Sequence, residues 1–249
     1  MPRTKKTEDT NAVMMETAAA QKSDAKEIVI NPIHIETATV TIIGDSPLIV
    51  HAWGEKAKRE MLESQKKQKK DKKARPVRDE FAEFMDALYW LTPKPEEHTR
   101  EAFEEAIEAG AKFGFPTIAI KDAALAASYR AGIIPNQVGM KCAFRLRAIE
   151  GADLGTGSEL CVIDTDEPPR CREDMVKIGG ISKVADLRYR PEFRNWKMRL
   201  KIELIQTGTF SMSSIINALN MGGFMNGIGE WRMERDGDFG AFHVQIGEE

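Results

Sequence analysis

Two groups of basic residues have the side-chain types and the spacing that bind a polyanion. The first group is a short run of lysines: Lys66, Lys67, Lys69, Lys70, Lys72 and Lys73. The second lies toward the C-terminus: Arg188, Arg190, Arg194, Lys197, Arg199 and Lys201. Nucleic-acid-binding proteins gather cations on one surface, even when their total charge is near zero, because each cation releases a counterion from a phosphate. We therefore predict that both groups contact phosphate.

The segment from residue 56 to residue 78 is strongly basic within a chain that is acidic overall. It contains eleven bases against three acids, a net charge of +8, whereas the 249-residue chain has a formal net charge of −3. Its lysines have few apolar residues among them, so no helical face is available to bury. We predict a basic insert at about residues 55–78, and a solvated loop without a partner is the alternative.

The second basic group is interleaved with Tyr189, Phe193 and Trp196. This pattern suits a single-stranded nucleic acid, whose bases stack on aromatic rings while cations follow its phosphates. Trp196 itself falls on the apolar face of an alternating strand, so we expect it in the core. A salt-bridged outer sheet face is the other reading of these six cations.

Glycines surround Arg232 near the C-terminus. Gly227 and Gly229 follow a predicted helix, so they are not a dinucleotide-binding fingerprint, and no Lys-Ser/Thr pair makes them a P-loop. Glycine weakens a strand, and the close approach of a second backbone is the usual compensation. We predict that Gly227, Gly229 and Gly240 let a nucleic acid approach the main chain and that Arg232 binds it.

Few residues suggest catalysis or metal binding. The four histidines are scattered, and only His51, which follows the first predicted strand, is a candidate general acid or base. A structural role for His51 is the alternative. The three cysteines form no CxxC pair, which disfavours a zinc site and a disulfide framework and suits a reducing cytoplasm. We predict a non-enzymatic protein without metal or cofactor.

The elements that must position these residues follow from periodicity. Alternation predicts strands over 36–44 and 196–204, and extended segments over 138–148, 159–164 and 181–190. Helical spacing predicts helices over 79–91, with a strand-like end at Tyr89 and Trp90 as the alternative, and over 94–110. Residues 114–132 are expected to form a short extended piece and then a helix that ends at Gly132. A further helix is predicted over 211–223, with Ser211 as N-cap and Gly222 and Gly223 at the C-cap. We predict a hairpin turn at 236–238.

Residues 1–30 balance acids against bases without periodicity, which predicts a disordered N-terminal arm. Residues 31–249 are then expected to form a single α+β domain that carries the basic insert. No run of about 18 apolar residues is present, so we expect no membrane contact and a cytoplasmic location.

One stretch resembles a known family. "GIGEWRMERDGDFGAF", residues 227–242, resembles the C-terminal glycine-rich loop of the RAMP proteins of CRISPR systems. From "TIIGDSPLIVHAW", residues 41–53, through that loop, the chain is also similar to a family of bacteriophage proteins encoded among early or recombination genes. The RAMP resemblance implies a ferredoxin-like or RRM-like antiparallel sheet with helices on one face that holds RNA, and some RAMP nucleases use a histidine placed like His51.

We therefore expect a non-enzymatic phage protein that binds single-stranded RNA or DNA in the bacterial host cell. It would form a homo-oligomer, either a filament or a ring, along the strand. Three alternatives stay open: a single-strand annealing or recombination protein, a RAMP-type endoribonuclease that uses His51, and a protein-protein module that mimics or blocks a host defence subunit.

Overall fold

Strand β10 (Trp196–Ile205) is central to the largest sheet. Its apolar and charged residues alternate, so one of its faces is buried. Trp196, Met198 and Leu200 are buried, and the residues between them point outward. One side of β10 pairs antiparallel with β1 (Ile35–Gly44), and the other with β4 (Phe144–Ala148). The outer edge of β1 pairs antiparallel with β11 (Phe242–Ile246), which makes the order β11-β1-β10-β4. The predicted strands over 36–44 and 196–204 are confirmed.

The computed structural model describes residues 32–53, 61–62, 65, 78–153, 159–178 and 184–246. They form a mixed α+β fold with antiparallel sheets, as expected. The predicted N-terminal arm and most of the basic insert lie outside the described residues.

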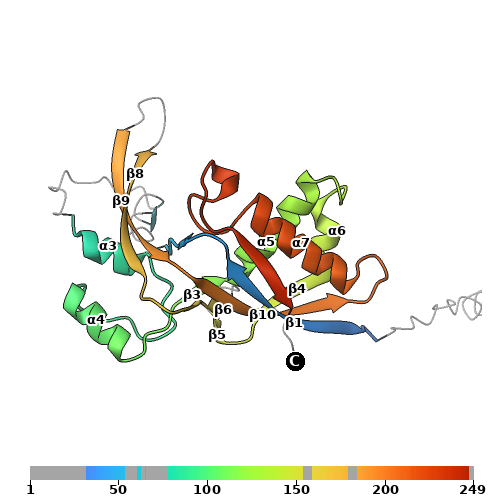
Figure 1. The fold of residues 1–249 in the computed structure, drawn as a ribbon, viewed down its shortest axis with the longest axis horizontal. Helices are drawn as coiled ribbons and strands as arrows, with labels where there is room; N and C mark the ends of the chain where they lie inside the picture. The colour runs from blue at the N-terminus through green and yellow to red at the C-terminus, as the bar shows by residue number, and fades with distance from the viewer. Residues whose placement is uncertain are drawn as a thin grey trace, which may run out of the picture. The chain divides into compact units, whose positions relative to one another are not determined.

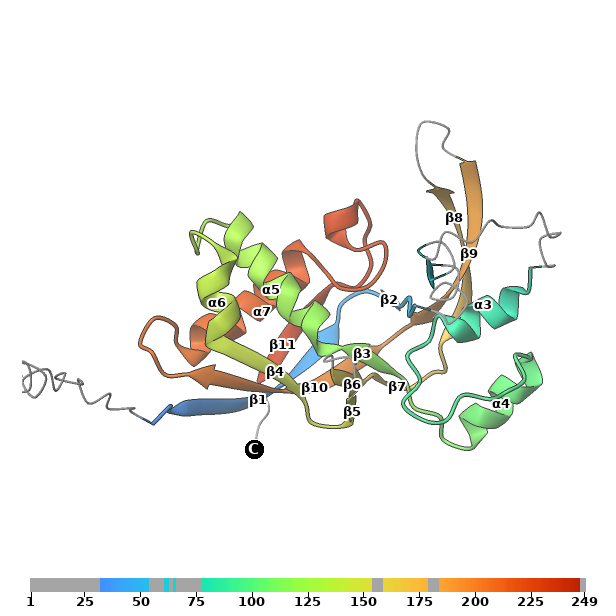
Figure 2. The same ribbon diagram turned by 180° about the vertical axis from the view of Figure 1, so that it is seen from behind.

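Helices α5 (Thr117–Arg130) and α7 (Met212–Met225) lie side by side and cover one face of this sheet (Figures 1 and 2). The Ser211 hydroxyl accepts a hydrogen bond from the backbone amide of Ser214, so the predicted N-cap is confirmed. The predicted C-cap is wrong, since the helix continues through Gly222 and Gly223. A Cβ on Gly222 would lie 2.7 Å from the Ala124 nitrogen, so this glycine allows α7 to pack closely on α5.

Two smaller sheets flank the first. One has the order β2-β9-β8 and contains β2 (Leu48–Ile49), β8 (Arg170–Ile178) and β9 (Val184–Phe193). The other has the order β3-β6-β5 and contains β3 (Gly114–Pro116), β5 (Gly151–Asp153) and β6 (Glu159–Val162). The short β7 (Asp164–Thr165) pairs with the start of β10.

An aromatic cluster joins two further helices, α3 (Glu80–Asp86) and α4 (Arg100–Glu108), to the sheets. The rings of Phe84 and Phe103 are 5.2 Å apart, and Phe103 packs 6.2 Å from Phe113. Phe113 in turn lies 5.9 Å from Phe193 of β9. The apolar faces of α3 and α4 therefore belong to the same core as the sheets.

Three local expectations are wrong. The first half of the extended segment expected over 138–148 is helix α6 (Gln137–Ala143), which Asn136 caps. The hairpin expected at 236–238 is a 3-10 turn, η1 (Met233–Arg235), followed by Asp236 in the left-handed region. The neighbouring bridge between Arg232 and Phe239 is parallel, whereas the two strands of a hairpin are antiparallel. Strand β8 was not expected at all.

Among the described residues, no helix combines the length and the apolar character needed to cross a membrane.

Candidate nucleic-acid interface

The face of the β11-β1-β10-β4 sheet opposite α5 and α7, which we call the open face, has no described helix packed on it (Figure 1). Its β10 residues are Lys197, Arg199 and Lys201, which alternate with buried residues and so point away from the core. Half of the second basic group is thus brought together on one surface.

Strand β4 adds two cations to the open face that were not predicted, Arg145 and Arg147. They alternate with buried Phe144 and Leu146. The pattern Phe-Arg-Leu-Arg was a usable signal, because alternation of this kind marks a strand with a basic outer side.

The register places Lys201 directly opposite Arg147 on the open face. Side chains in directly opposite positions are about 5 Å apart at Cβ, and like charges there are destabilising. Two glutamates offset the repulsion. The Glu203 carboxylate lies 3.2 Å from Lys201 Nζ and 3.5 Å from Arg147 Nε, and Glu159 lies 2.8 Å from another nitrogen of Arg147. The hydrogen bond from Lys201, followed by the contact with Arg147, lowers the pKa of Glu203.

The other cations of the open face form exposed ion pairs. Lys197 Nζ lies 3.2 Å from Asp164, and an Arg199 nitrogen lies 3.8 Å from Glu150. Exposed pairs of this kind contribute about 0–1 kcal/mol. A phosphate can therefore replace these carboxylates at little cost, although the expected alternative of a salt-bridged sheet face also describes these contacts.

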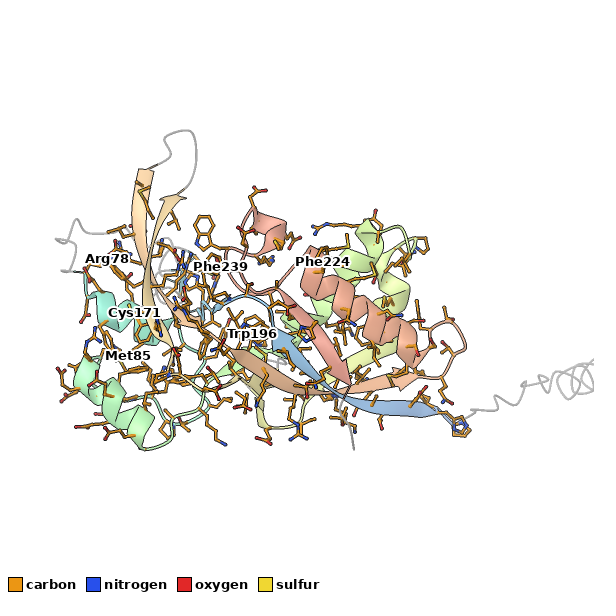
Figure 3. All side chains as sticks on the ribbon, in the orientation of Figure 1. Arg78, Met85, Cys171, Trp196, Phe224 and Phe239 are labelled. Carbon is orange, nitrogen blue, oxygen red and sulfur yellow. The ribbon has the colours of Figure 1, made fainter. Side chains whose placement is uncertain are left out.

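Threonine hydroxyls from β1 complete the surface. Thr39 lies opposite Lys201 and Thr41 lies opposite Arg199. The described outward side chains of the four strands include no Phe, Tyr or Trp. Trp196 is 1% exposed, as expected for a core residue, and its Nε1 donates to the Ser46 carbonyl at 2.8 Å (Figure 3). The open face therefore offers cations and hydroxyls without a stacking platform.

The other half of the second basic group belongs to β9 and the turn after it. Arg188 pairs with Asp186 at 3.0 Å, and Arg194 pairs with Glu192 at 2.7 Å. Both arginines are partly exposed. Arg190 is only 8% exposed. The six cations are thus divided between β10 on one side and β9 with the turn after it on the other, and Arg190 does not face solvent.

Arg190 belongs to a buried polar network at the base of the β8–β9 pair. Its guanidinium lies 3.8 Å from Asp174 and 3.6 Å from Glu230. Arg172 bridges Asp174 and Glu192 at 2.7 and 2.9 Å, and its guanidinium lies 4.5 Å from the ring centre of Phe239 (Figure 3). The network joins the β8–β9 pair to the glycine-rich loop. Its acidic members were not predicted as functional, because partners so distant in sequence leave no local pattern.

The glycines of that loop have an intramolecular explanation. Gly229 and Gly240 have φ angles of 78° and 69°, a region that L side chains rarely adopt. A Cβ on Gly240 would clash with the Ile228 carbonyl oxygen, and one on Gly229 with that of Ile49. The second backbone that approaches is thus the chain's own, and a nucleic acid is not needed to explain these glycines. A Cβ on Gly227 would likewise lie 3.0 Å from the Phe239 carbonyl oxygen.

The Arg232 side chain also makes its hydrogen bonds within the loop. Its guanidinium donates to the Gly229 carbonyl at 2.9 Å and to the Glu234 carboxylate at 2.9 Å. The structure therefore places Arg232 in a contact that stabilises the loop.

His51 is partly exposed beside the buried network, and its Nδ1 lies 3.6 Å from a Glu230 carboxylate oxygen. The interaction with His51 is the main cause that lowers the pKa of Glu230; burial opposes the shift, and Arg190 and Arg232 add to it. A histidine held by a carboxylate is a common arrangement for a general acid or base.

Lys66, Lys67, Lys69, Lys70, Lys72 and Lys73 lie outside the described residues. In the described part of the chain, no group of three or more His, Cys, Asp or Glu side chains is placed to hold a metal ion. Neither a protein-family model nor a curated protein sequence matches this chain.

Proposed function

We propose that this protein binds single-stranded nucleic acid, RNA or DNA, on the open face of its largest sheet, and that copies of it assemble along the strand. The observation that carries the proposal is the set of cations that β4 and β10 present on a face without a covering helix: Arg145, Arg147, Lys197, Arg199 and Lys201. Two of them, Lys201 and Arg147, are directly opposed in register, and a phosphate could take the place of the glutamates that pair with them.

The arrangement of the elements supports a ferredoxin-like or RRM-like core. Along the chain the relevant elements follow as β1, α5, β4, β10, α7 and β11, and the sheet order is β11-β1-β10-β4. This is the β-α-β-β-α-β order of that fold. RRM sheets bind RNA on the face without helices, through aromatic residues. Since the open face has none among its described side chains, we infer that this chain holds the sugar-phosphate backbone rather than stacked bases.

The lysine-rich segment adds phosphate contacts in this proposal, as do Arg188 and Arg194. The role of the lysine-rich segment is supported by its positive net charge within a chain that is acidic overall. The resemblance to phage proteins supports a role in the cytoplasm of an infected bacterium.

Salt dependence tests the proposal. If the complex uses six or more phosphate contacts, affinity for a labelled oligonucleotide should fall roughly a thousandfold between about 50 and 200 mM salt. Fluorescence anisotropy measures this. The variant with Lys197→Gln, Arg199→Gln and Lys201→Gln should bind more weakly at every sequence, and its log–log salt slope should fall by about one for each phosphate that it no longer neutralises.

Arg100→Gln is the matched control, because it removes an exposed cation from α4, away from the open face. Its affinity and slope should equal those of the native protein. An affinity that is flat across salt, or a triple variant that binds as the native protein does, would contradict the proposal.

If native protein anneals complementary oligonucleotides, the single-strand annealing alternative is favoured over simple coating. If it ignores nucleic acid, the protein-protein module is favoured.

A second candidate function, endoribonuclease activity, is supported by the contact between His51 and Glu230. In that case His51→Ala should abolish cleavage of a labelled RNA and leave binding unchanged, since the residue lies outside the open face. Lack of cleavage by native protein under binding conditions rules this candidate out.

A further inference from the structure

A small pocket lies at the outer edge of the largest sheet, where α5 begins. Strand β4 is the last strand in the order β11-β1-β10-β4. Residues of α5 and of β4 line the pocket, which has a volume of about 220 Å³. Pockets for drug-sized ligands begin at about 300 Å³, so this one suits a single small group. We call it the edge pocket.

The start of α5 brings backbone N–H groups to the edge pocket. Strand β3 leads directly into the helix, so the N-cap is Pro116, which has no side chain that can accept a hydrogen bond (Figure 2). The first turn contains no acidic residue. The first N–H groups of a helix have no partner within it, and together with the helix dipole they favour an anion. Thr117 and Ile118, the first two residues of the helix, both line the pocket.

The Thr117 side chain is an independent indication of a ligand. Thr117 is only 5% exposed, and within the described part of the chain its hydroxyl forms no hydrogen bond. Buried hydroxyl groups nearly always have a hydrogen-bond partner. Because this residue lines the edge pocket, a group that occupies the pocket would supply the partner.

Lys121 holds an ammonium group at the edge pocket. Two of its N–H groups donate to the carbonyls of Lys141 and Phe144, at 2.7 and 2.5 Å, and Nζ lies 4.7 Å from the centre of the Phe144 ring. An ammonium has three N–H groups, so one is left for a ligand. Burial lowers the pKa of Lys121, Asp122 opposes the shift, and the positive charges of Lys141 and Arg145 add to it. A bound anion would offset this repulsion.

Two arginines of the open face complete the lining, Arg145 and Arg147 of β4. Glu159 also lines the pocket, but both oxygens of its carboxylate have partners. One accepts a hydrogen bond from Arg147 at 2.8 Å, and the other accepts from the Ala148 amide at 2.9 Å. Arg145 has no carboxylate partner among the described residues. Three cations are therefore present against one carboxylate.

We propose that the edge pocket binds a phosphate group. The N–H groups of the first turn of α5, the Thr117 hydroxyl and the Lys121 ammonium donate hydrogen bonds to its oxygens, and Arg145 and Arg147 add positive charge. That this phosphate belongs to a nucleic acid rests on the proposed function. The two arginines belong to both the pocket and the open face, so a strand on that face can place a phosphate here. The phosphate comes either from within the strand or from its 5′ end.

Titration of the full chain with inorganic phosphate tests the pocket. In amide NMR spectra the Thr117 and Ile118 signals should shift until they saturate, whereas sodium chloride at equal ionic strength should not saturate them. Thr117→Val keeps the shape of the side chain, and Arg145→Gln removes an exposed cation. Each should weaken phosphate binding roughly tenfold, the effect of one lost hydrogen bond to a charged group.

Ser128→Ala is the matched control for the hydroxyl. It removes a hydroxyl from the same helix, but this one donates to the Ala124 carbonyl and lies outside the pocket lining. Its phosphate titration should equal that of the native protein. Arg100→Gln serves in the same way as the control for the loss of an exposed cation.

Two oligonucleotides of one sequence, with a 5′-phosphate or a 5′-hydroxyl, identify the source of the phosphate. A terminal phosphate predicts tighter binding of the first oligonucleotide, and Thr117→Val should remove that preference. An internal phosphate predicts equal affinities, and Thr117→Val should lower both of them. If Thr117→Val binds each oligonucleotide as the native protein does, the link between the pocket and the strand is overturned.

The pocket itself is overturned if phosphate shifts the two amide signals no more than sodium chloride does, or if Arg145→Gln titrates like the native protein. Equal melting temperatures would show that the variants are folded, and the exposed Arg145→Gln decides if Thr117→Val is not. Phosphate binding without oligonucleotide binding removes only the proposed function. Oligonucleotide binding by a protein whose amide signals ignore phosphate removes only the pocket.

Discussion

At the scale of the residue, Gly240 shows that a position without a side chain can be required for packing inside the protein. Its positive φ and the neighbouring Ile228 carbonyl both exclude a side chain. From sequence, the same glycine suggested an external polymer. A glycine indicates that another group lies close to its backbone, but it does not indicate which group that is. The nearest backbone here comes from the same loop.

Gly240→Ala should therefore lower the free energy of unfolding by more than the roughly 1–2 kcal/mol that a left-handed alanine costs, because a clash adds to the strain. Urea denaturation measures the change. Gly132→Ala is the control for the φ term, since Gly132 has a φ of 70° and open space around its Cβ position. Equal losses at the two positions would show that the Ile228 contact is unimportant.

Glu192 makes stability depend on pH. Burial pushes its pKa upward, but hydrogen bonds and charge from Arg172 and Arg194 more than offset this, so the pKa lies below its ordinary value of 4.5. A carboxylate with a depressed pKa adds stability above its unfolded pKa, and that stability is lost as pH falls through the folded pKa. Urea midpoints should therefore drop below about pH 4.5, and Glu192→Gln should flatten this part of the profile. The same slope in both proteins would assign the acid sensitivity to other groups.

At the scale of the element, the strands and helices with clean periodicity were predictable and the others were not. Strand β10 and helix α7 each have one continuous apolar face, so their patterns survive in sequence. Strand β8 was missed because four of its first five residues are charged, so its sequence shows no alternation of apolar and polar residues. Asp174 is buried against arginines that a sequence pattern cannot place beside it. The Gly222-Gly223 pair was misassigned because a helix stop and a close helix contact both require glycine.

The buried network should matter to the β8–β9 pair as a unit. Arg190→Met leaves the Asp174 carboxylate buried with Arg172 as its remaining partner. We expect a loss of roughly 1–3 kcal/mol in urea denaturation, the range for a buried polar group that loses a partner. Arg194→Met removes a similar but exposed side chain and should cost under about 1 kcal/mol. A small loss at Arg190 would mean that the network relaxes or admits water.

At the scale of the whole molecule, the candidate interface was only half visible in the sequence. The run from Lys197 to Lys201 was identified because its cations are near neighbours. Arg145 and Arg147 join it only through the pairing of β4 with β10, which depends on the three-dimensional register. Conversely, Arg190 has the same spacing from Arg188 as other neighbouring cations of the group but is buried, because this part of β9 packs against Asp174 and Glu230.

The position of β1 between β10 and β11 has a consequence for biosynthesis. The residues that pair with Ile35 and Ile43 are Ile205 and Lys197, and β11 is later still. During translation at about 5–20 residues per second, this early strand waits on the order of ten seconds for either neighbour to leave the ribosome. Its apolar side is exposed throughout that interval, so nascent chains should depend on a holding chaperone, and stalling the ribosome before residue 196 should leave a protease-sensitive product.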